Sequence, residues 1–406
     1  MNTEYDISAK DTRLISLIGV SHGWSHFYQL SLPPLFWFIH TEDGLSYFQL
    51  GMLVTAFYVC SGVFQPAAGF IVDRFGPRRV LYAGIAAMAV GTALLGLVLG
   101  FYGMLLAAII TGMGNAVFHP ADFTILSQNV SEQRVGRAFG IHAFVGFLGY
   151  AVAPMTMLWL ADNLGWRAAL VVAGAAGLVF LMVLRFLDRG ELEVQLDEDS
   201  NPKSSVVVEL RTLLTLPIIA CFLFFLATAM AQIGLQTFSP AALLILFETP
   251  KAVGSVAVTL FLFATAFGVL GGGVLADRST RHHIVAMVCL GVPALLSIVP
   301  GYVQLSTYSL CVVFVVIGIG LGLSIPARDM LVRALAPATA RGRVFGFVYA
   351  GLDVGSAVTP AVFGWLLDHG YAPWIFMSLG AFFVCAMIAA AFAAAPYKLS
   401  PVLSKP

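Results

Sequence analysis

The chain has 406 residues, of which 59% are hydrophobic and only 10% are charged, and its formal net charge is zero. Soluble domains carry about 25% charged residues, so this composition excludes an ordinary soluble enzyme and a nucleic-acid-binding protein. A mean hydropathy of +0.91 indicates a membrane protein, and the length suffices for about twelve spans of roughly 20 residues.

Twelve apolar runs predict twelve membrane-spanning helices, so the predicted fold class is all-α. In chain order the runs cover residues 13–38, 46–72, 79–99, 102–127, 136–161, 166–187, 212–240, 252–275, 283–303, 306–333, 343–366 and 372–395. Of the 21 Lys and Arg residues, all but Arg167, Lys251 and Arg328 then lie on the side of the N-terminus. Because basic residues accumulate on the cytoplasmic side of membranes, both termini are predicted to be cytoplasmic.

The second half of the chain repeats the first. RVGRAFGIHAFVGFLGYAVAP (134–154) matches ARGRVFGFVYAGLDVGSAVTP (340–360), and GFIVDRFGPRR (69–79) matches GVLADRSTRHH (273–283). Since six helices separate equivalent positions, the two copies have the same orientation in the membrane. With the polar stretch between them, the pattern predicts an N-terminal six-helix half (1–188), a cytoplasmic linker (189–211) and a C-terminal six-helix half (212–406).

GFIVDRFGPRRVL (69–81) resembles the signature loop of the major facilitator superfamily, and the copy at 273–283 stands where that family keeps its second loop. The resemblance covers the whole chain and implies two parallel six-helix repeats that transport a solute by alternating access. VFHP (117–120) and HF (26–27) resemble the fosmidomycin-resistance-like efflux branch of the family. Two departures weaken the case for a drug exporter: Ala108 replaces the arginine of many drug–proton antiporters, and Ala153 breaks their GxxxGP pattern.

The residues singled out in the two loops are Gly69, Asp73, Arg74, Gly76, Arg78 and Arg79, and Asp277 and Arg278 in the second copy. Gly69 is expected to let neighbouring helices approach closely, and Gly76 to permit a sharp turn. The resemblance implies that Asp73 contacts the start of the eleventh helix near Arg343 and stabilises the outward-facing state. The alternative is that these charges only anchor the topology at the lipid headgroups.

A few polar residues interrupt the predicted helices. A charge at mid-bilayer costs roughly 2.5–3.5 kcal/mol on insertion scales, so such residues usually face a cavity. The resemblance implies that the first, fourth, seventh and tenth helices line a central cavity, with the fifth and eleventh beside them. The expected substrate-binding or coupling residues on these helices are His22, His26, Gln29, Asn115, His119, Asp122, His142, Gln232, Gln236, Arg328, Asp329, Tyr349 and Asp353.

His22 and His26 lie four residues apart and therefore share one face of a helix. Three interpretations remain open: a metal site, hydrogen bonds between helices, and binding of a proton or substrate. The first helix contains no carboxylate or Cys that would complete a metal site, so no metal or cofactor is predicted. The sequence also contains no HExxH, GxSxG or channel filter motif, and we expect neither an enzyme nor a channel.

These observations predict a monomeric, multi-pass carrier of the inner membrane that moves a small organic anion and is coupled to protons. The alternatives are sodium coupling, proton-driven efflux of a drug or metabolite, and transport of a metal or metal chelate. Asp353 is expected to be a proton-coupling carboxylate. Asp122 and Arg328 occupy equivalent positions in the two repeats, so we expect them to pair when the carrier opens outward and to separate when it opens inward. Arg328 is then expected to bind the anionic cargo.

Overall fold

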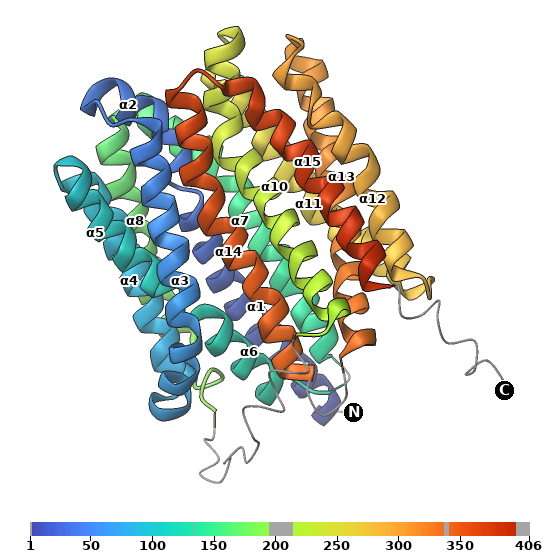
Figure 1. Ribbon diagram of the computed structural model, residues 1–406. Helices are drawn as coiled ribbons and strands as arrows, with labels where there is room; N and C mark the ends of the chain where they lie inside the picture. Colours follow the sequence, from blue (N-terminus) through green and yellow to red (C-terminus); the bar gives the residue numbers. More distant parts are fainter. Residues whose placement is uncertain (1, 133, 195–213, 337–340, 395–406) are drawn as a thin grey trace.

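The computed structural model of the chain describes residues 2–132, 134–194, 214–336 and 341–394, and for residues 2–9 and 341–343 it describes the backbone only. The described chain is a bundle of long helices (Figure 1). The first half contains α1 (Asn2–Gln29), η1 (Pro33–Leu35), α2 (Phe36–Asp43), α3 (Tyr47–Phe75), α4 (Pro77–Leu97), α5 (Gly100–Asn115), α6 (Phe118–Asn129), α7 (Val135–Leu164) and α8 (Trp166–Leu187). The second half contains α10 (Leu216–Phe247), α11 (Lys251–Asp277), α12 (His282–Leu296), η2 (Val299–Gly301), α13 (Thr307–Leu335), α14 (Arg341–Asp368) and α15 (Ala372–Ala393).

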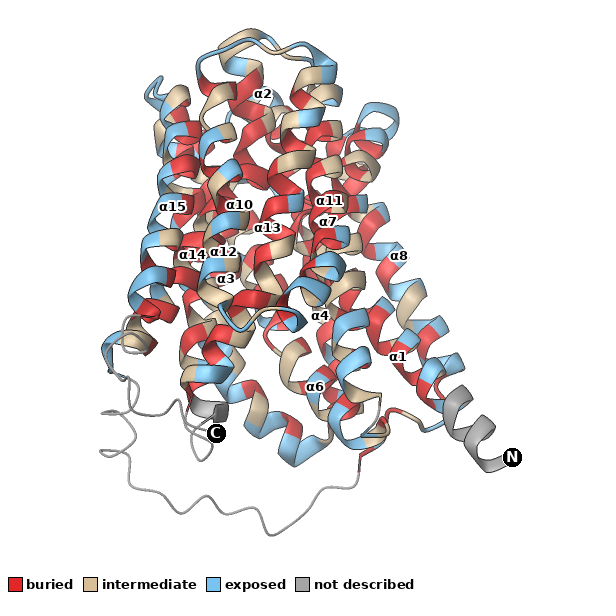
Figure 2. Ribbon diagram, turned by 90° about the vertical axis from the view of Figure 1, so that its right-hand side faces the viewer, coloured by how far each residue is buried: buried red, intermediate tan, exposed pale blue. Residues whose placement is uncertain are grey.

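The predicted all-α membrane fold with two six-helix halves is confirmed. Eleven helices of the described chain are long and apolar enough to cross a membrane, if α5 and α6 are taken as one span. The twelfth, α1, is more polar, because charged residues occupy its first part and the histidines and Gln29 its last part. Buried residues follow the interior of the bundle (Figure 2), whereas large apolar side chains such as Phe70 and Phe186 stay 78% and 87% exposed on its outside. Lipid is the solvent that suits such a surface.

Prolines lie where two of the predicted helices end early and where a third is interrupted. The first was predicted to reach residue 38, but α1 ends at Gln29, because Pro33 and Pro34 follow and direct the chain into η1 and α2. The predicted helix 102–127 is broken into α5 and α6, and the predicted helix 283–303 ends early at Leu296, before η2. The predicted linker falls largely within residues 195–213, outside the described residues.

The two halves contact each other mainly through α3 with α14 and α7 with α11. The contacts are close at the end of the bundle that carries α2, hereafter the α2 end. There Thr55 donates a hydrogen bond to the carbonyl of Ala357 (2.6 Å), and the Asp368 carboxylate accepts from the backbone N–H groups of Tyr47 (2.8 Å) and Phe48 (2.7 Å). A carboxylate at a helix N-terminus is favourable, and it fastens α14 to the first turn of α3.

The opposite end, hereafter the arginine-rich end, contains the α3–α4 turn with Arg74 and Arg79. A Cβ added at Gly69, Gly140 or Gly346 would meet no atom within 4 Å there. The expectation that Gly69 permits a close helix approach is therefore wrong for this arrangement, in which the halves are joined at the α2 end instead.

Gly51, near the α2 end of α3, is expected to be intolerant of a side chain. Its added Cβ would overlap the carbonyl oxygen of Pro360 on α14, so Gly51→Val must push the two halves apart. We expect a stability loss of about 1–3 kcal/mol, measured as a lower Tm of the purified protein. Gly69→Val is the matched control, because it makes the same change on the same helix in open space. Equal Tm values for the two variants would contradict this packing.

Candidate functional site

The break between α5 and α6 lies in the sequence GNAVFHPADFT (114–124). Pro120 has no N–H to donate to the carbonyl of Ala116, so the helical ladder is interrupted where α5 ends at Asn115. The helix resumes at Phe118 and carries Asp122 into the bundle, where this side chain is fully buried. Ala116 and Val117 keep near-helical backbone angles, so the interruption is local and Gly100–Asn129 forms one membrane-length span.

Four histidines and one aspartate meet around this break, and we call them the His–Asp cluster: His22 and His26 on α1, His119 and Asp122 on α6, and His142 on α7. His142 Nε2 lies 2.9 Å from Asp122 Oδ2, and His22 Nδ1 lies 3.5 Å from the same oxygen. The rings of His22 and His142 stack with centroids 3.7 Å apart. Gly146 makes room for the His22 and His26 rings, since a Cβ there would lie 2.8 Å from His22 Cδ2 and 3.1 Å from His26 Cε1.

Several atoms of the His–Asp cluster are buried without a hydrogen-bond partner among the described residues. They are the Nδ1 atoms of His22, His26 and His119, and Oδ1 of Asp122. Each such atom costs about 1–3 kcal/mol unless water or an ion satisfies it. The ligand atoms of His22, Asp122 and His142 all lie within 4.8 Å of one another, so these three residues could hold a metal ion. The carboxylate of this group does not come from the first helix: it belongs to Asp122 of α6, which lies next to His22 and His142.

Next to the His–Asp cluster lies a hydrogen-bonded group of amides and hydroxyls, which we call the amide–tyrosine cluster. Gln29 Nε2 donates to Asn115 Oδ1 (3.1 Å), and Asn115 Nδ2 donates to Ser61 Oγ (2.8 Å). Tyr150 and Tyr58 both donate to Gln29 Oε1. Of these residues, Ser61, Tyr58 and Tyr150 were not predicted. Tyr and Ser are common within apolar helices, and only the fold shows which of them face Gln29.

Asp353 lies in the seam between the halves. A Cβ added at Gly62 of α3 would lie 3.0 Å from Asp353 Cβ on α14, so the two helices touch at this point. The carboxyl group also interacts electrostatically with Tyr58 and Tyr150 of the amide–tyrosine cluster. It makes no hydrogen bond or ion pair with any residue that the structure describes. Asp353 is therefore a half-buried carboxyl group that belongs to one half and faces polar groups of the other.

Arg328 is buried in the second half of the chain. Its Nε lies 3.1 Å from Asp329 Oδ1, and its guanidinium lies 3.9 Å from the centroid of the Phe225 ring and 6.0 Å from that of Tyr349. The ion pair with the adjacent Asp329 was not predicted. Phe225 was not predicted; an apolar residue on α10 gives no sequence signal of a cation–π contact.

Asp122 pairs with His142, and Arg328 pairs with Asp329. Asp122 and Arg328 are therefore not paired in this arrangement, and they were predicted to pair only when the carrier opens outward. Gln236 is buried and both polar atoms of its amide lack a partner among the described residues, whereas Gln232 is half-buried and belongs to neither cluster. The structure therefore unites the predicted residues of the first half, but it leaves these two glutamines apart from them.

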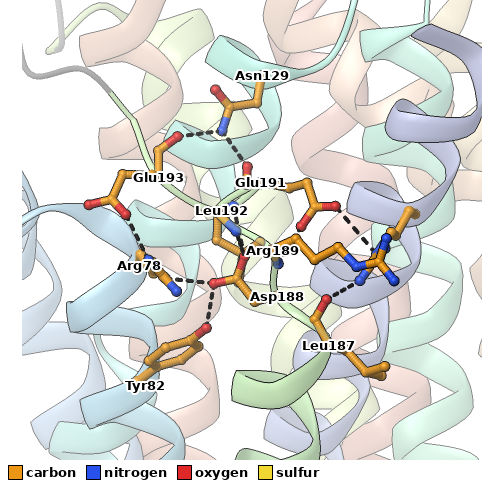
Figure 3. Close-up of polar contacts among 11 residues, drawn as sticks. Arg78, Tyr82, Asn129, Leu187, Asp188, Arg189, Glu191, Leu192 and Glu193 are labelled. Carbon is orange, nitrogen blue, oxygen red and sulfur yellow. Dashed lines mark hydrogen bonds and ion pairs between the residues drawn. The ribbon is translucent and has the colours of Figure 1, made fainter. Parts of the chain in front are cut away.

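The loop residues at the arginine-rich end form an ion-pair network (Figure 3). Arg78 contacts Asp188 (2.6 Å) and Glu193 (2.7 Å), which follow α8. Tyr82 donates to Asp188 (2.6 Å), and Asn129 of α6 donates to the backbone carbonyls of Glu191 and Glu193. Residues 188–193 thus join the ends of α4, α6 and α8.

The remaining loop residues stay outside this network. Gly76 has a φ of 83°, which confirms the predicted sharp turn. Asp73, Arg79, Asp277 and Arg278 are exposed, and Arg74 lies over the ring of the neighbouring Phe75. The side chain of Arg343, the predicted partner of Asp73, lies outside the described residues.

Asp188→Asn is expected to destabilise the protein in a pH-dependent way. Burial alone would raise the pKa of Asp188, but hydrogen bonds from Tyr82 and from the N–H groups of Gly190 and Leu192, together with the charge of Arg78, lower its pKa overall. A lowered pKa stabilises the fold above the unfolded value of about 4 and loses that effect as the pH falls through the folded value. The Tm deficit of the variant should therefore be full at neutral pH and shrink below about pH 4.

The exposed Asp277→Asn is the control for this experiment and should leave Tm unchanged. A deficit of Asp188→Asn that persists undiminished in acid would contradict an ionised Asp188 in the folded network.

Comparison with known proteins agrees with this architecture. A sequence model of the Major Facilitator Superfamily matches residues 16–248 and 224–405. The chain is 25% identical to the fosmidomycin resistance protein of Escherichia coli (strain K12), over 88% of this chain and 86% of that protein. It is 28% identical to the "Probable L-galactonate transporter" of the same organism, over 39% of this chain and 35% of that protein.

Among solved structures, a bacterial homologue of the human lysosomal transporter Spinster, in an inward-facing and occupied conformation, superposes with a TM-score of 0.75 at 15% identity. The match covers 95% of this chain and 97% of that chain. At this identity the likeness concerns the fold alone.

Proposed function

Because the chain belongs to the major facilitator superfamily, we propose that it is a proton-coupled carrier that moves a small organic anion across the inner membrane by alternating access between its two halves. The resemblance of its VFHP and HF segments to the fosmidomycin-resistance branch is confirmed by the full-length relative. Members of this superfamily are transporters rather than enzymes. Membership of the superfamily implies transport; the proton as coupling ion and the organic anion as cargo are proposed here in addition.

The arginine-rich end faces the cytoplasm in this proposal. Basic residues concentrate at that end, as the positive-inside rule requires. The two basic residues expected at the α2 end are both engaged: Arg167 pairs with Asp43, and Lys251 lies 3.5 Å from the centroid of the Trp37 ring. With this orientation the α2 end is external, and the joined α3–α14 seam closes the protein to the outside.

The position of Asp353 is the observation that supports proton coupling. A carboxyl group without a partner is expensive to ionise in the membrane interior, and Asp353 has none among the described residues. Alternating access must part α3 from α14 at the seam, so the same carboxyl group meets the two sides of the membrane in turn. Such a group can bind a proton on one side and release it on the other.

Arg328 supports an anionic cargo. A guanidinium stays charged in a buried place, and only its Nε is bonded to Asp329. The guanidinium also interacts with the side chain of Tyr349, and its planar fork suits a carboxylate or a similar group. One relative is named for the transport of L-galactonate, which is such an anion.

A thermal-shift screen of the purified protein tests the cargo class. The panel contains mono- and dicarboxylates including L-galactonate, with uncharged sugars of matched size as controls, at acidic and at neutral pH. We expect anions alone to raise Tm. Stabilisation by the neutral sugars, and not by any anion, would contradict the proposal.

Efflux of a drug is the second candidate. The similarity to the fosmidomycin resistance protein, which covers 86% of that protein, favours it. Expression of this chain in a fosmidomycin-sensitive bacterium tests it directly. A raised inhibitory concentration of fosmidomycin, lost again in the Arg328→Ala variant, would identify the drug as a cargo of the same site.

A further inference from the structure

We propose that His22, Asp122 and His142 bind a divalent transition-metal ion of the first row, for which Zn²⁺ is the representative. The ion would be a resident part of the first half rather than the cargo. This inference rests on the His–Asp cluster and is independent of the proposed roles of Asp353 and Arg328.

The chemistry of the three side chains suits such an ion. Imidazole nitrogen together with a carboxylate oxygen is a common ligand set for Zn²⁺ and its neighbours. In a tetrahedral site with bonds of about 2.0 Å, the ligand atoms lie about 3.3 Å apart. The observed separations from Asp122 Oδ2 are 2.9 Å to His142 Nε2 and 3.5 Å to His22 Nδ1, and all three ligand atoms lie within 4.8 Å of one another. The stacked rings of His22 and His142 must turn apart for both nitrogens to bind the same ion as Asp122.

The unpaired atoms are a second, independent indication of a ligand. His22 Nδ1 and Asp122 Oδ1 are buried and have no hydrogen-bond partner among the described residues, although both groups bond water strongly when exposed. The Asp122 carboxylate would supply negative charge against the cation, and neutral imidazoles would supply the remaining ligands. His119 also has an unpaired buried Nδ1, and its ring centroid lies 5.3 Å from that of His22, which makes it the nearest source of a fourth ligand.

The burial of the cluster indicates a retained ion. His22 and His142 are each 3% exposed and Asp122 is fully buried, so a bound ion would be shielded from water. The three ligands come from α1, α6 and α7, and an ion between them would fix the direction in which α6 continues after the broken helix. The ion would therefore stabilise the bent α5–α6 segment.

Direct metal analysis tests the inference. The full-length protein is purified in detergent with an affinity tag that contains no histidine, stripped with a chelator, loaded with Zn²⁺ and desalted. Elemental analysis should find one Zn²⁺ per chain. Asp122→Asn and His142→Gln should each lower the affinity for Zn²⁺ by more than about tenfold, since even indirect changes around a metal site cost that much. His369→Gln removes an exposed histidine directly after α14 and should leave the content unchanged.

Loading the unmodified protein with Co²⁺ gives a readout that does not depend on the folding of any variant. Co²⁺ in a four-coordinate site should give strong visible absorption, which Zn²⁺ should displace. If the unmodified protein retains no Zn²⁺ and shows no Co²⁺ absorption, the cluster is held by hydrogen bonds alone and the inference is overturned. Equal Zn²⁺ retention by Asp122→Asn, His142→Gln and the unmodified protein would place the metal elsewhere and overturn it as well.

Discussion

Asp353→Asn is expected to abolish uphill transport of the cargo while exchange of cargo across the membrane continues. The asparagine has nearly the same shape, so the α3–α14 seam at Gly62 should still close. It cannot take up or release a proton, however, and the step that couples proton movement to the opening of the seam is lost. Reconstituted protein in liposomes allows both modes to be measured with the same radiolabelled anion, with and without an imposed pH gradient.

Asp329→Asn is the matched control for this experiment, because Asp329 is a carboxylate of the same half that already has a partner in Arg328. It should keep the response to the pH gradient if Asp353 is the coupling group. Full uphill transport by Asp353→Asn would end the coupling role of this residue.

Arg328→Lys should weaken binding of the anion more than it lowers the amount of folded protein. The lysine keeps the positive charge but loses the planar fork and the stacking over Phe225. Loss of one charge-assisted hydrogen bond costs about 1.5–3 kcal/mol, which corresponds to a roughly tenfold to hundredfold rise in Kd. The Kd is measured by titration of the purified protein with the anion that gives the largest thermal shift.

Arg333→Lys is the control for Arg328, since it makes the same change one turn further along α13 at an exposed position. It should leave the Kd unchanged. If Arg328→Lys and Arg328→Ala bind the anion as tightly as the unmodified protein, at normal thermal stability, the cargo does not use this guanidinium.

The fold was predictable because apolar runs mark the spans and the match between distant segments such as 134–154 and 340–360 reveals the two halves. The same signals could not locate the ends of α1 and α12 or the break between α5 and α6. Apolar residues continue past Pro33, Pro120 and Pro300, and a hydropathy pattern does not register the hydrogen bonds that a proline removes.

The candidate site was predictable in part. His22, His26, His119, Asp122 and His142 stand out because charged and titratable groups are rare in membrane spans, and the fold brings all five together. Tyr58, Tyr150 and Phe225 could not be found in this way, since aromatic residues are abundant in the chain and only the packing decides which of them meet a polar group. The contact between Arg328 and Asp329 was not predicted for a related reason: spacing rules describe neighbours three or four residues apart, and Asp329 is adjacent.

Proton coupling can be tested by measuring proton movement that the cargo itself drives. The protein is reconstituted in liposomes that contain a fluorescent pH indicator, and a gradient of the stabilising anion is imposed without any pH gradient. We expect protons to move with or against the anion in the unmodified protein, and this signal to disappear in Asp353→Asn. Flux of the anion with no change in internal pH would contradict proton coupling.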